Sequence, residues 1–247
     1  MNEVANTRKW WASALMIGAV VGLACLLIGA LGAKLGMWGF QTGFLFLAVG
    51  VILATLCFFL GVIAFVLCTV KGFKAERGAV LTGVIISVVI LALMGNQYSQ
   101  AQAVPPIHNI TTDTENPPQF DKIVALREAG QANPLPLTDE VIEAQKKAYP
   151  QLRSLVSTDS QAAMVAKAAQ VVEQMGMELV ATDTTQGLVE ATDTTFWFGF
   201  KDDVVIRVLP EGSGSVVDVR SVSRVGQSDL GKNAQRISEI LAALGAN

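Results

Sequence analysis

The sequence predicts an α+β protein: an antiparallel sheet of about four to five strands with helices packed on one face, preceded by three transmembrane helices. The 51% hydrophobic content, against 16% charged residues, is too apolar for an ordinary soluble domain of 247 residues. Residues 1–95 hold six of the 18 Lys and Arg but only two of the 21 acids, so their net charge is +4 while the remainder carries −7. These contrasts predict a membrane anchor at 1–95, a proline-rich extended tether at 96–137 and an exported domain at 138–247.

Three segments without a charged side chain, 12–33, 43–70 and 78–95, are long enough to cross a hydrocarbon core of about 30 Å. We interpret them as transmembrane helices whose partner is the lipid bilayer. A cleaved signal peptide is the competing interpretation of the first segment, but its apolar run exceeds the usual length of about 7 to 15 residues. The small residues Ala14, Gly18 and Gly22 favour close helix packing, either within the bundle or between the protomers of a homo-oligomer.

Basic residues in the short loops predict the orientation. Five of them flank the first helix or fill the second loop, whereas Lys34 alone lies in the first loop; the five are Arg8, Lys9, Lys71, Lys74 and Arg77. Because short cytoplasmic loops are enriched in Lys and Arg, the N-terminus is expected in the cytoplasm. This predicts a multi-pass membrane protein whose C-terminal domain is exported to the outer side of the membrane.

Six of the eight prolines fall within 96–137, which disfavours helix there, while Ile107, Ile110 and Phe120 favour packing of part of this tether along the domain. Thr138 is a candidate N-cap for a helix at 139–149. A second helix has Thr158 and Gln161 as a capping box and Gly176 beyond its end. Ser228 is the expected N-cap of a final helix that stops at Gly245.

Between these helices the hydrophobic period changes to two, which predicts strands at 178–182, 187–194, 196–200, 203–209 and 215–222. The short connections indicate antiparallel pairing. In the strand at 196–200, the aromatic side chains at even positions are expected to face the core, and Trp197 to face a partner or a membrane surface. Asp202 and Asp203 are expected in a hairpin turn.

The segment 217–237, which joins the last strand to the last helix, concentrates the polar residues that suit a binding site. Arginine side chains and the free amides of a helix N-terminus both attract phosphate or carboxylate groups. The candidate anion site comprises Arg220, Arg224, Ser228, Asp229, Asn233 and Arg236. The alternative is a structural corner in which Arg220 and Arg224 pair with Asp218 and Asp229 without any ligand.

The C-terminal part contains few residues of the types that catalyse reactions or bind metal ions. It contains no cysteine and a single histidine, His108, and none of its serines has a neighbouring base, so we predict no catalytic residue, no metal and no cofactor. Its acidic charge excludes nucleic-acid binding through a basic face. The sequence therefore favours a non-enzymatic membrane protein whose exported domain binds a partner protein or a small anion. The alternatives are a hydrolase-like envelope enzyme acting on an anionic substrate and an accessory subunit of a membrane complex.

Three motifs occur in order along the C-terminal part: IHNITTDTENPPQF, ATDTTFWFGFKDDVVIRV and VDVRSVSRVGQSDLGKNAQRI. Together they resemble a family of bacterial and plastid proteins defined as a domain of unknown function, whose hallmark is the segment RSxSRxGxSDxGxNxxRI. The resemblance covers residues 105–244 and leaves the three-helix anchor outside. It implies a Gram-negative envelope setting, which with the predicted orientation means the bacterial inner membrane and a periplasmic C-terminal domain. It carries no reaction, cofactor or catalytic residue.

Overall fold

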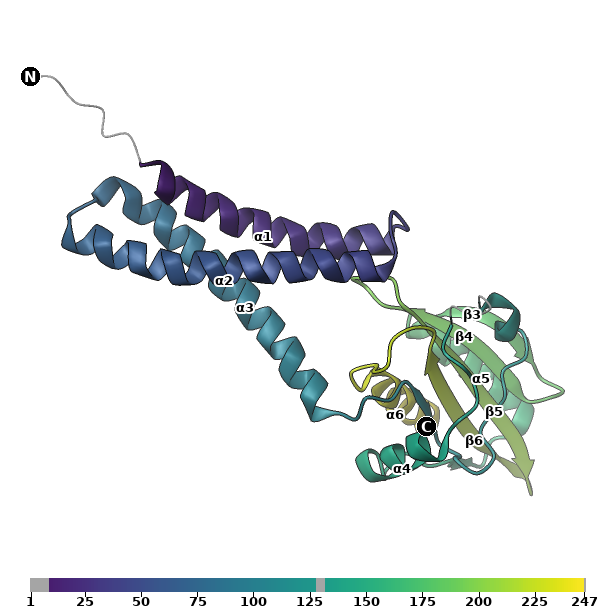
Figure 1. Cartoon of the computed structure of the whole chain (residues 1–247). Coiled ribbons are helices and arrows are strands. Elements are labelled where there is room, and N and C mark those ends of the chain that lie inside the picture. Colours follow the sequence, from purple (N-terminus) through teal and green to yellow (C-terminus); the bar gives the residue numbers. More distant parts are fainter. Residues whose placement is uncertain (1–8, 128–131, 247) are drawn as a thin grey trace, which may run out of the picture. The chain divides into compact units, whose positions relative to one another are not determined.

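The structure, a computed structural model, describes residues 9–127 and 132–246 (Figure 1). The chain divides into two compact units. The first consists of the N-terminal helices up to Ser99 and also takes in residues 197–199. The second, here called the sheet unit, consists of the rest of the chain from Gln100 onward.

The first unit is formed by three long helices, the last of them up to Ser99: α1 (Trp10–Lys34), α2 (Phe40–Val70) and α3 (Lys74–Ala103). Each is long and apolar enough to cross a membrane, as the sequence predicts. Glycines allow α1 and α2 to approach closely, since a Cβ added at Gly50 would lie 2.7 Å from the carbonyl oxygen of Gly22. Helix α3 continues beyond Gly95 into the expected tether, because residues 96–103 contain no proline or glycine to end it.

The sheet unit is built on an antiparallel sheet whose strands are β1 (Asn109–Thr111), β2 (Leu155–Ser157), β3 (Glu178–Asp183), β4 (Leu188–Thr194), β5 (Lys201–Glu211) and β6 (Gly214–Ser223). The strand order is β1-β6-β5-β4-β3, and β2 also pairs with β6. The α+β class and the antiparallel pairing are therefore confirmed.

The helices of this unit have caps that differ in part from the prediction. Helix α4 (Asp139–Ala148) has the predicted N-cap, Thr138. Helix α5 (Gln161–Gln174) is capped by Ser160, whose hydroxyl accepts a hydrogen bond from the Ala163 amide, so the predicted capping box at Thr158 is wrong. Helix α6 (Lys232–Gly245) begins later than Ser228, because Leu230 and Gly231 adopt positive φ angles of 56° and 78° that interrupt the helix.

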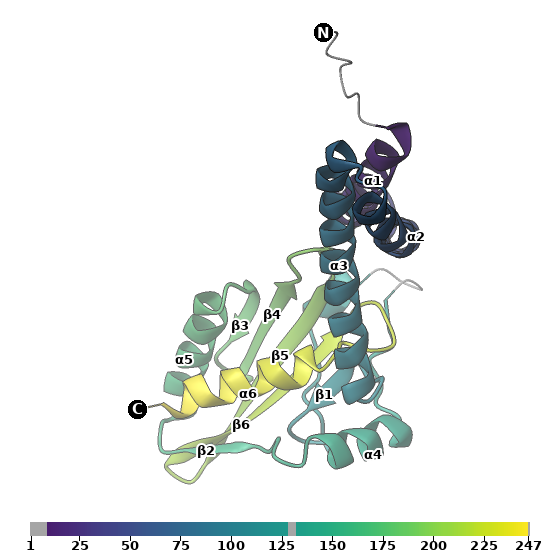
Figure 2. The ribbon, with the colours of Figure 1, turned by 90° about the vertical axis from the view of Figure 1, so that its left-hand side faces the viewer.

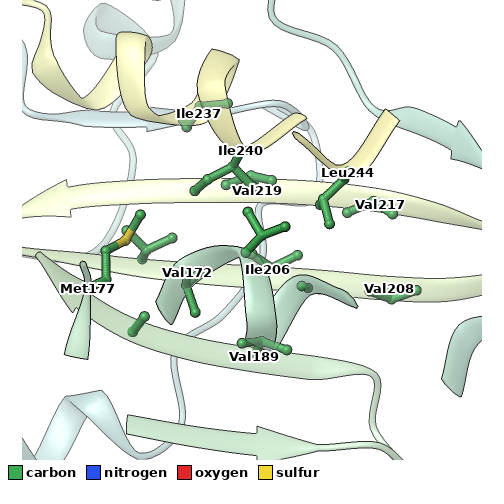
Figure 3. Packing of buried hydrophobic residues seen from close by; sticks show 14 of the residues in the cluster. Val172, Met177, Val189, Ile206, Val208, Val217, Val219, Ile237, Ile240 and Leu244 are labelled. Atoms are coloured by element: carbon green, nitrogen blue, oxygen red, sulfur yellow. The ribbon is translucent and has the colours of Figure 1, made fainter. Parts of the chain in front are cut away.

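Helices α5 and α6 lie side by side on one face of the sheet, which we call the inner face (Figure 2). Their apolar stripes pack on alternate residues of β4, β5 and β6, as Figure 3 shows for Val172, Ile237 and Ile240 above Val189, Ile206 and Val219. Ile206, Val219, Ile237 and Ile240 are completely buried. This layer is the main core of the sheet unit.

The opposite, outer face is covered by residues 112–127 and 132–135, which we call the 112–135 layer. Phe120 and Ile123, the latter at the start of the 3₁₀ helix η1 (Ile123–Leu126), pack with Leu135 against Val205 and Val222. All four of the residues Ile107, Ile110, Phe120 and Ile123 are buried. Most of the segment expected as a tether is thus a layer of the folded unit, although residues 128–131 lie outside the described residues.

The predicted strand at 196–200 is wrong. Strand β4 ends at Thr194 and β5 begins at Lys201, so these residues form the connecting loop, and Phe196 is 70% exposed instead of facing the core. Gly199, with φ of +67°, favours the turn. The predicted hairpin turn at Asp202 and Asp203 is wrong for the same reason, since both residues lie buried inside β5.

Candidate functional site

Asp202 and Asp203 are adjacent in β5, so their side chains point to opposite faces of the sheet. Each carboxylate is the centre of a buried polar cluster. The inner cluster, beneath α6, comprises Asp193, Asp202, Ser221, Ser223, Asn233 and Arg236. The outer cluster, beneath the 112–135 layer, comprises Asn109, Arg127, Thr192, Asp203, Arg220 and Arg224.

In the inner cluster, Arg236 reaches from α6 to the ends of β4 and β5. Its Nη2 atom lies 2.6 Å from Asp193 Oδ2 and 2.8 Å from Asp202 Oδ2. Its Nη1 atom donates to Ser221 Oγ on β6 at 3.0 Å. The guanidinium of Arg236 is therefore fully occupied by partners within the chain, and it fixes α6 across three strands.

Asn233 completes this cluster and ties it to the start of the sheet. Its Nδ2 atom donates to the carbonyl oxygen of His108 and to Ser223 Oγ, both at 3.0 Å. Its Oδ1 atom accepts from Ser221 Oγ at 2.7 Å. Every polar atom of this amide has a partner, which explains why Asn233 is completely buried.

Asp229 occupies the N-terminus of α6. Its Oδ1 accepts from the Gly231 amide and its Oδ2 from the Asn233 amide, both at 2.8 Å. Burial raises the pKa of the Asp229 carboxyl, while these two hydrogen bonds act in the opposite direction. Ser228 accepts from the Leu230 amide at 3.2 Å. A carboxylate of the chain thus takes the helix amides at which an external anion was expected.

In the outer cluster, two arginines share the carboxylate of Asp203. Arg224 forms a bidentate contact, with Nη2 2.8 Å from Oδ1 and Nε 2.9 Å from Oδ2, while Arg127 Nη1 lies 2.5 Å from Oδ2. Thr192 also donates to Oδ1 at 3.0 Å. Since the Asp203 side chain has no exposed surface, this paired arrangement offsets its desolvation.

Within the part of the chain that the structure describes, no carboxylate pairs with Arg220. It donates instead to Asn109 Oδ1 at 3.1 Å, to the carbonyl oxygen of Pro118 at 3.0 Å and to the carbonyl oxygen of Leu135. Burial, with the nearby charge of Arg127, lowers the pKa of Arg220 to about 10, so the guanidinium remains charged at neutral pH. All three acceptors belong to β1 or to the 112–135 layer, so Arg220 holds this layer on the sheet.

Two further contacts fasten the same layer. Glu190 on β4 accepts hydrogen bonds from the amides of Asp121 and Lys122 at 2.6 and 2.7 Å, at the start of η1. Arg207 on β5 lies 2.8 Å from Asp218 and 3.0 Å from Asp113. These polar contacts surround the small apolar cluster of Phe120 and Ile123.

The six candidate site residues are therefore not gathered in one place. Arg220 and Arg224 lie on the outer face, Asn233 and Arg236 lie on the inner face, and Ser228 and Asp229 belong to the loop before α6. The ion pairs proposed for a structural corner differ from those in the structure. Arg224 pairs with Asp203, and Asp218 pairs with Arg207. Asp218, Arg220 and Val222 do lie on one face of β6, as the alternation of side chains along a strand requires.

The sequence interpretation missed Asp202 and Asp203, the two residues on which the clusters depend. The pattern DDVVIRV contained the signal. Period-two alternation puts Asp202 on the same face as Val204 and Ile206, and Asp203 on the same face as Val205 and Arg207. Arg127 and Asn109 could not be found in this way, because their contacts with β5 and β6 join residues far apart in the chain.

Cavities near the clusters are small. One hollow of about 200 Å³ is lined by Met175, Met177, Asp193, Lys232, Gln235, Arg236 and Glu239, and another of about 280 Å³ is lined mainly by α4 and the residues after it. Neither is lined by Asp218 or Asp229. Within residues 9–127 and 132–246, no three His, Cys, Asp or Glu side chains gather in a way that could hold a metal ion.

Residues 109–244, from the first residue of β1 to the last turn of α6, match the family model described as protein of unknown function (DUF1499). The chain belongs to this DUF1499 family. The matched region contains both polar clusters and all six candidate site residues, and it begins well before residue 138. A comparison with curated proteins gives no match.

Proposed function

We propose that this protein is a non-enzymatic binding protein of the bacterial inner membrane, which displays its DUF1499 unit in the periplasm for a partner protein of the cell envelope. The three apolar helices support the membrane location, and the distribution of Lys and Arg among their loops supports the orientation. The closed polar clusters support a role without catalysis, because their charged groups hold the fold together.

An exposed row of apolar side chains on the outer face is the observation that favours a partner protein over a small anion. Val156, Val216 and Leu209 are paired across β2, β6 and β5, so their side chains stand in line on one face. Val156 is 70% exposed and Leu209 is 42% exposed. The 112–135 layer covers Val205 and Val222 on this face but leaves this row open. Apolar side chains aligned in this way suit the core of a protein interface.

The partner is tested by photo-crosslinking in cells that express the full chain. A benzophenone amino acid at Val156 is expected to give one discrete adduct, while the same residue at Gln235, exposed on α6, gives none. Adducts of equal strength and pattern at both positions, or none at Val156, would reject the apolar row as the binding surface.

The orientation is tested with fusions of alkaline phosphatase, which is active only outside the cytoplasm. A fusion after Asn247 is expected to be active and a fusion after Gly72, in the second loop, inactive. The reverse pattern would place the DUF1499 unit in the cytoplasm.

The small-anion alternative at Arg220, Arg224, Ser228, Asp229, Asn233 and Arg236 remains a separate proposal. Since the side-chain donors of the three arginines and Asn233 are bonded within the chain, we expect inorganic phosphate to leave the thermal unfolding of the full chain in detergent unchanged. An anion site filled to 100 times its Kd would instead stabilise the protein by about 2.7 kcal/mol. Stabilisation lost in Arg224→Lys, which retains the charge, would favour the anion over the partner protein.

A further inference from the structure

A hollow of about 280 Å³ lies where helix α4 meets the edge strand β1, and we call it the basic hollow. Gln145 holds α4 at this edge, because its Nε2 atom donates to the Thr111 carbonyl oxygen at 2.7 Å and its Oε1 atom accepts from the Thr111 amide at 3.0 Å (Figure 2). The hollow has room for one side chain and is smaller than the pockets that hold drug-sized ligands. It is lined by Thr112, Thr114, Gln145, Lys146, Tyr149, Pro150, Leu152 and Arg153.

The cations of the basic hollow have donors to spare, unlike those of the two polar clusters. Arg153 donates from Nε to a backbone carbonyl at 3.4 Å, and among the described residues neither its Nη atoms nor Lys146 Nζ has a partner. Both side chains are exposed. Asp218, which accepts a hydrogen bond from Thr112 of the hollow, is already paired with Arg207. Two positive charges are therefore available here for an anionic group from outside the chain.

The strands place the basic hollow next to the apolar row that contains Val156 and Val216. Thr112 of the hollow donates from Oγ1 to Asp218 Oδ1 at 2.9 Å, and Asp218 lies two residues from Val216 on the same face of β6. Val156 pairs with Val216 and follows Arg153 by three residues, so the Cα atoms of Val156 and Arg153 are at most about 11 Å apart. One short extended segment of a partner can therefore contact both the row and the hollow.

Apolar surface beside unpaired cations fits a segment that carries apolar and acidic side chains together. An exposed ion pair contributes little in water, so a free anion such as phosphate is expected to bind the basic hollow weakly. Apolar contacts on the neighbouring row add affinity, and a carboxylate that binds in the hollow at the same time adds specificity. The two features together select an acidic protein segment over a free anion.

We propose that the basic hollow binds an acidic side chain of the partner protein, from a segment whose apolar side chains lie on the row of Val156, Val216 and Leu209. The carboxylate contacts Lys146 Nζ and the Nη atoms of Arg153. It lies about three residues along an extended chain from the apolar side chains. The inference rests on the proposed function, because the row is the surface proposed there for the partner.

The first test measures the yield of the benzophenone adduct at Val156 in cells that express the full chain. Lys146→Glu is expected to lower this yield about tenfold, because it replaces attraction of the carboxylate by repulsion. Lys147→Glu makes the same change of charge at the next exposed position of α4, which does not line the hollow, and should change the yield by less than about twofold. Lys146→Arg, which retains the charge, should retain the adduct.

The second test identifies the chemistry of the partner's side chain. A carbodiimide joins an amine directly to a carboxylate, so in membranes from the same cells it is expected to join Lys146 to the partner and give an adduct of the same mass as the one at Val156. This adduct should be lost in Lys146→Arg, whose guanidinium does not react, and should persist in Lys147→Arg.

The outcomes distinguish this inference from the proposed function. Equal yields at Val156 in Lys146→Glu and Lys147→Glu, or equal carbodiimide adducts in Lys146→Arg and Lys147→Arg, would overturn the inference and leave the partner protein on the row. No adduct at Val156 in the otherwise unchanged chain would reject the proposed function and the inference with it. An adduct of twice the mass of the chain would mean that a second copy, and not another protein, covers the hollow.

Discussion

At the scale of single residues, Asp203 is the residue on which the outer cluster depends. It is a completely buried carboxylate that neutralises two arginines, and its partners come from β4, from the segment after η1 and from the loop after β6. Because desolvation of a charge is costly, such a group stabilises a fold only when all of its partners are in place. Its removal leaves Arg127 and Arg224 side by side without a counter-charge.

Asp203→Ala is therefore expected to lower the free energy of unfolding by about 3 to 5 kcal/mol, the range for breaking a buried ion pair. Asp159→Ala, which removes an exposed acid, serves as the control and should change it by less than about 0.5 kcal/mol. The measurement is denaturant unfolding of the full chain in detergent. Equal effects of the two variants would show that the outer cluster does not stabilise the fold.

Asp229 gives a prediction on pH. Since burial raises the pKa of its carboxyl in the folded protein, protonation favours the folded state. Its stabilising contribution is present below the ordinary Asp pKa and is lost as pH rises through the raised value. The stability of the wild type relative to Asp229→Asn should therefore fall as the pH rises above the ordinary Asp pKa of about 4. A difference that stays constant, or that grows with pH, in unfolding curves measured from this pH upward would contradict the assignment.

At the scale of elements, the sequence predicts helices and strands most accurately where a single local pattern determines them. The three spans, α4 with its Thr138 cap and the strands β3, β4 and β6 follow from composition, capping and period-two alternation. The strand proposed at 196–200 is wrong because aromatic residues favour strands in general, whereas Gly199 and the Thr195–Phe200 hydrogen bonds form a loop here. The covering of the outer face was only partly predictable, since it depends on contacts between distant segments such as Glu190 with η1.

The start of α5 allows a direct test of its cap. Ser160→Ala removes the hydroxyl that accepts from the Ala163 amide and should cost about 1 kcal/mol. Thr158→Ala, two residues earlier and also exposed, should cost less than about 0.5 kcal/mol. The reverse order of the two losses in the free energy of unfolding would restore the capping box predicted from the sequence.

At the scale of the whole molecule, the sheet unit needs its N-terminal layer. Val205 and Val222 would be exposed without Phe120 and Ile123, and Arg220 would lose its acceptors from Asn109, Pro118 and Leu135. The sheet unit, which begins at Gln100, therefore includes the chain before residue 138.

A fragment of residues 104–247 is expected to unfold cooperatively, whereas a fragment of residues 138–247 should show no cooperative transition. Circular dichroism during thermal unfolding distinguishes them. Cooperative unfolding of the shorter fragment at a similar temperature would mean that residues 104–137 are a dispensable tether.

The central claim is that the buried charges hold the 112–135 layer on the sheet and do not serve a ligand. Hydrogen–deuterium exchange of the full chain tests it most directly, by comparison of the wild type with Asp203→Asn, which retains the size of the side chain but not its charge. The account predicts faster exchange in peptides that cover Thr112 to Leu126, with those of α5 unchanged. Unchanged protection of the layer, together with slower exchange of the wild type on addition of inorganic phosphate, would contradict it and make the cluster a ligand site.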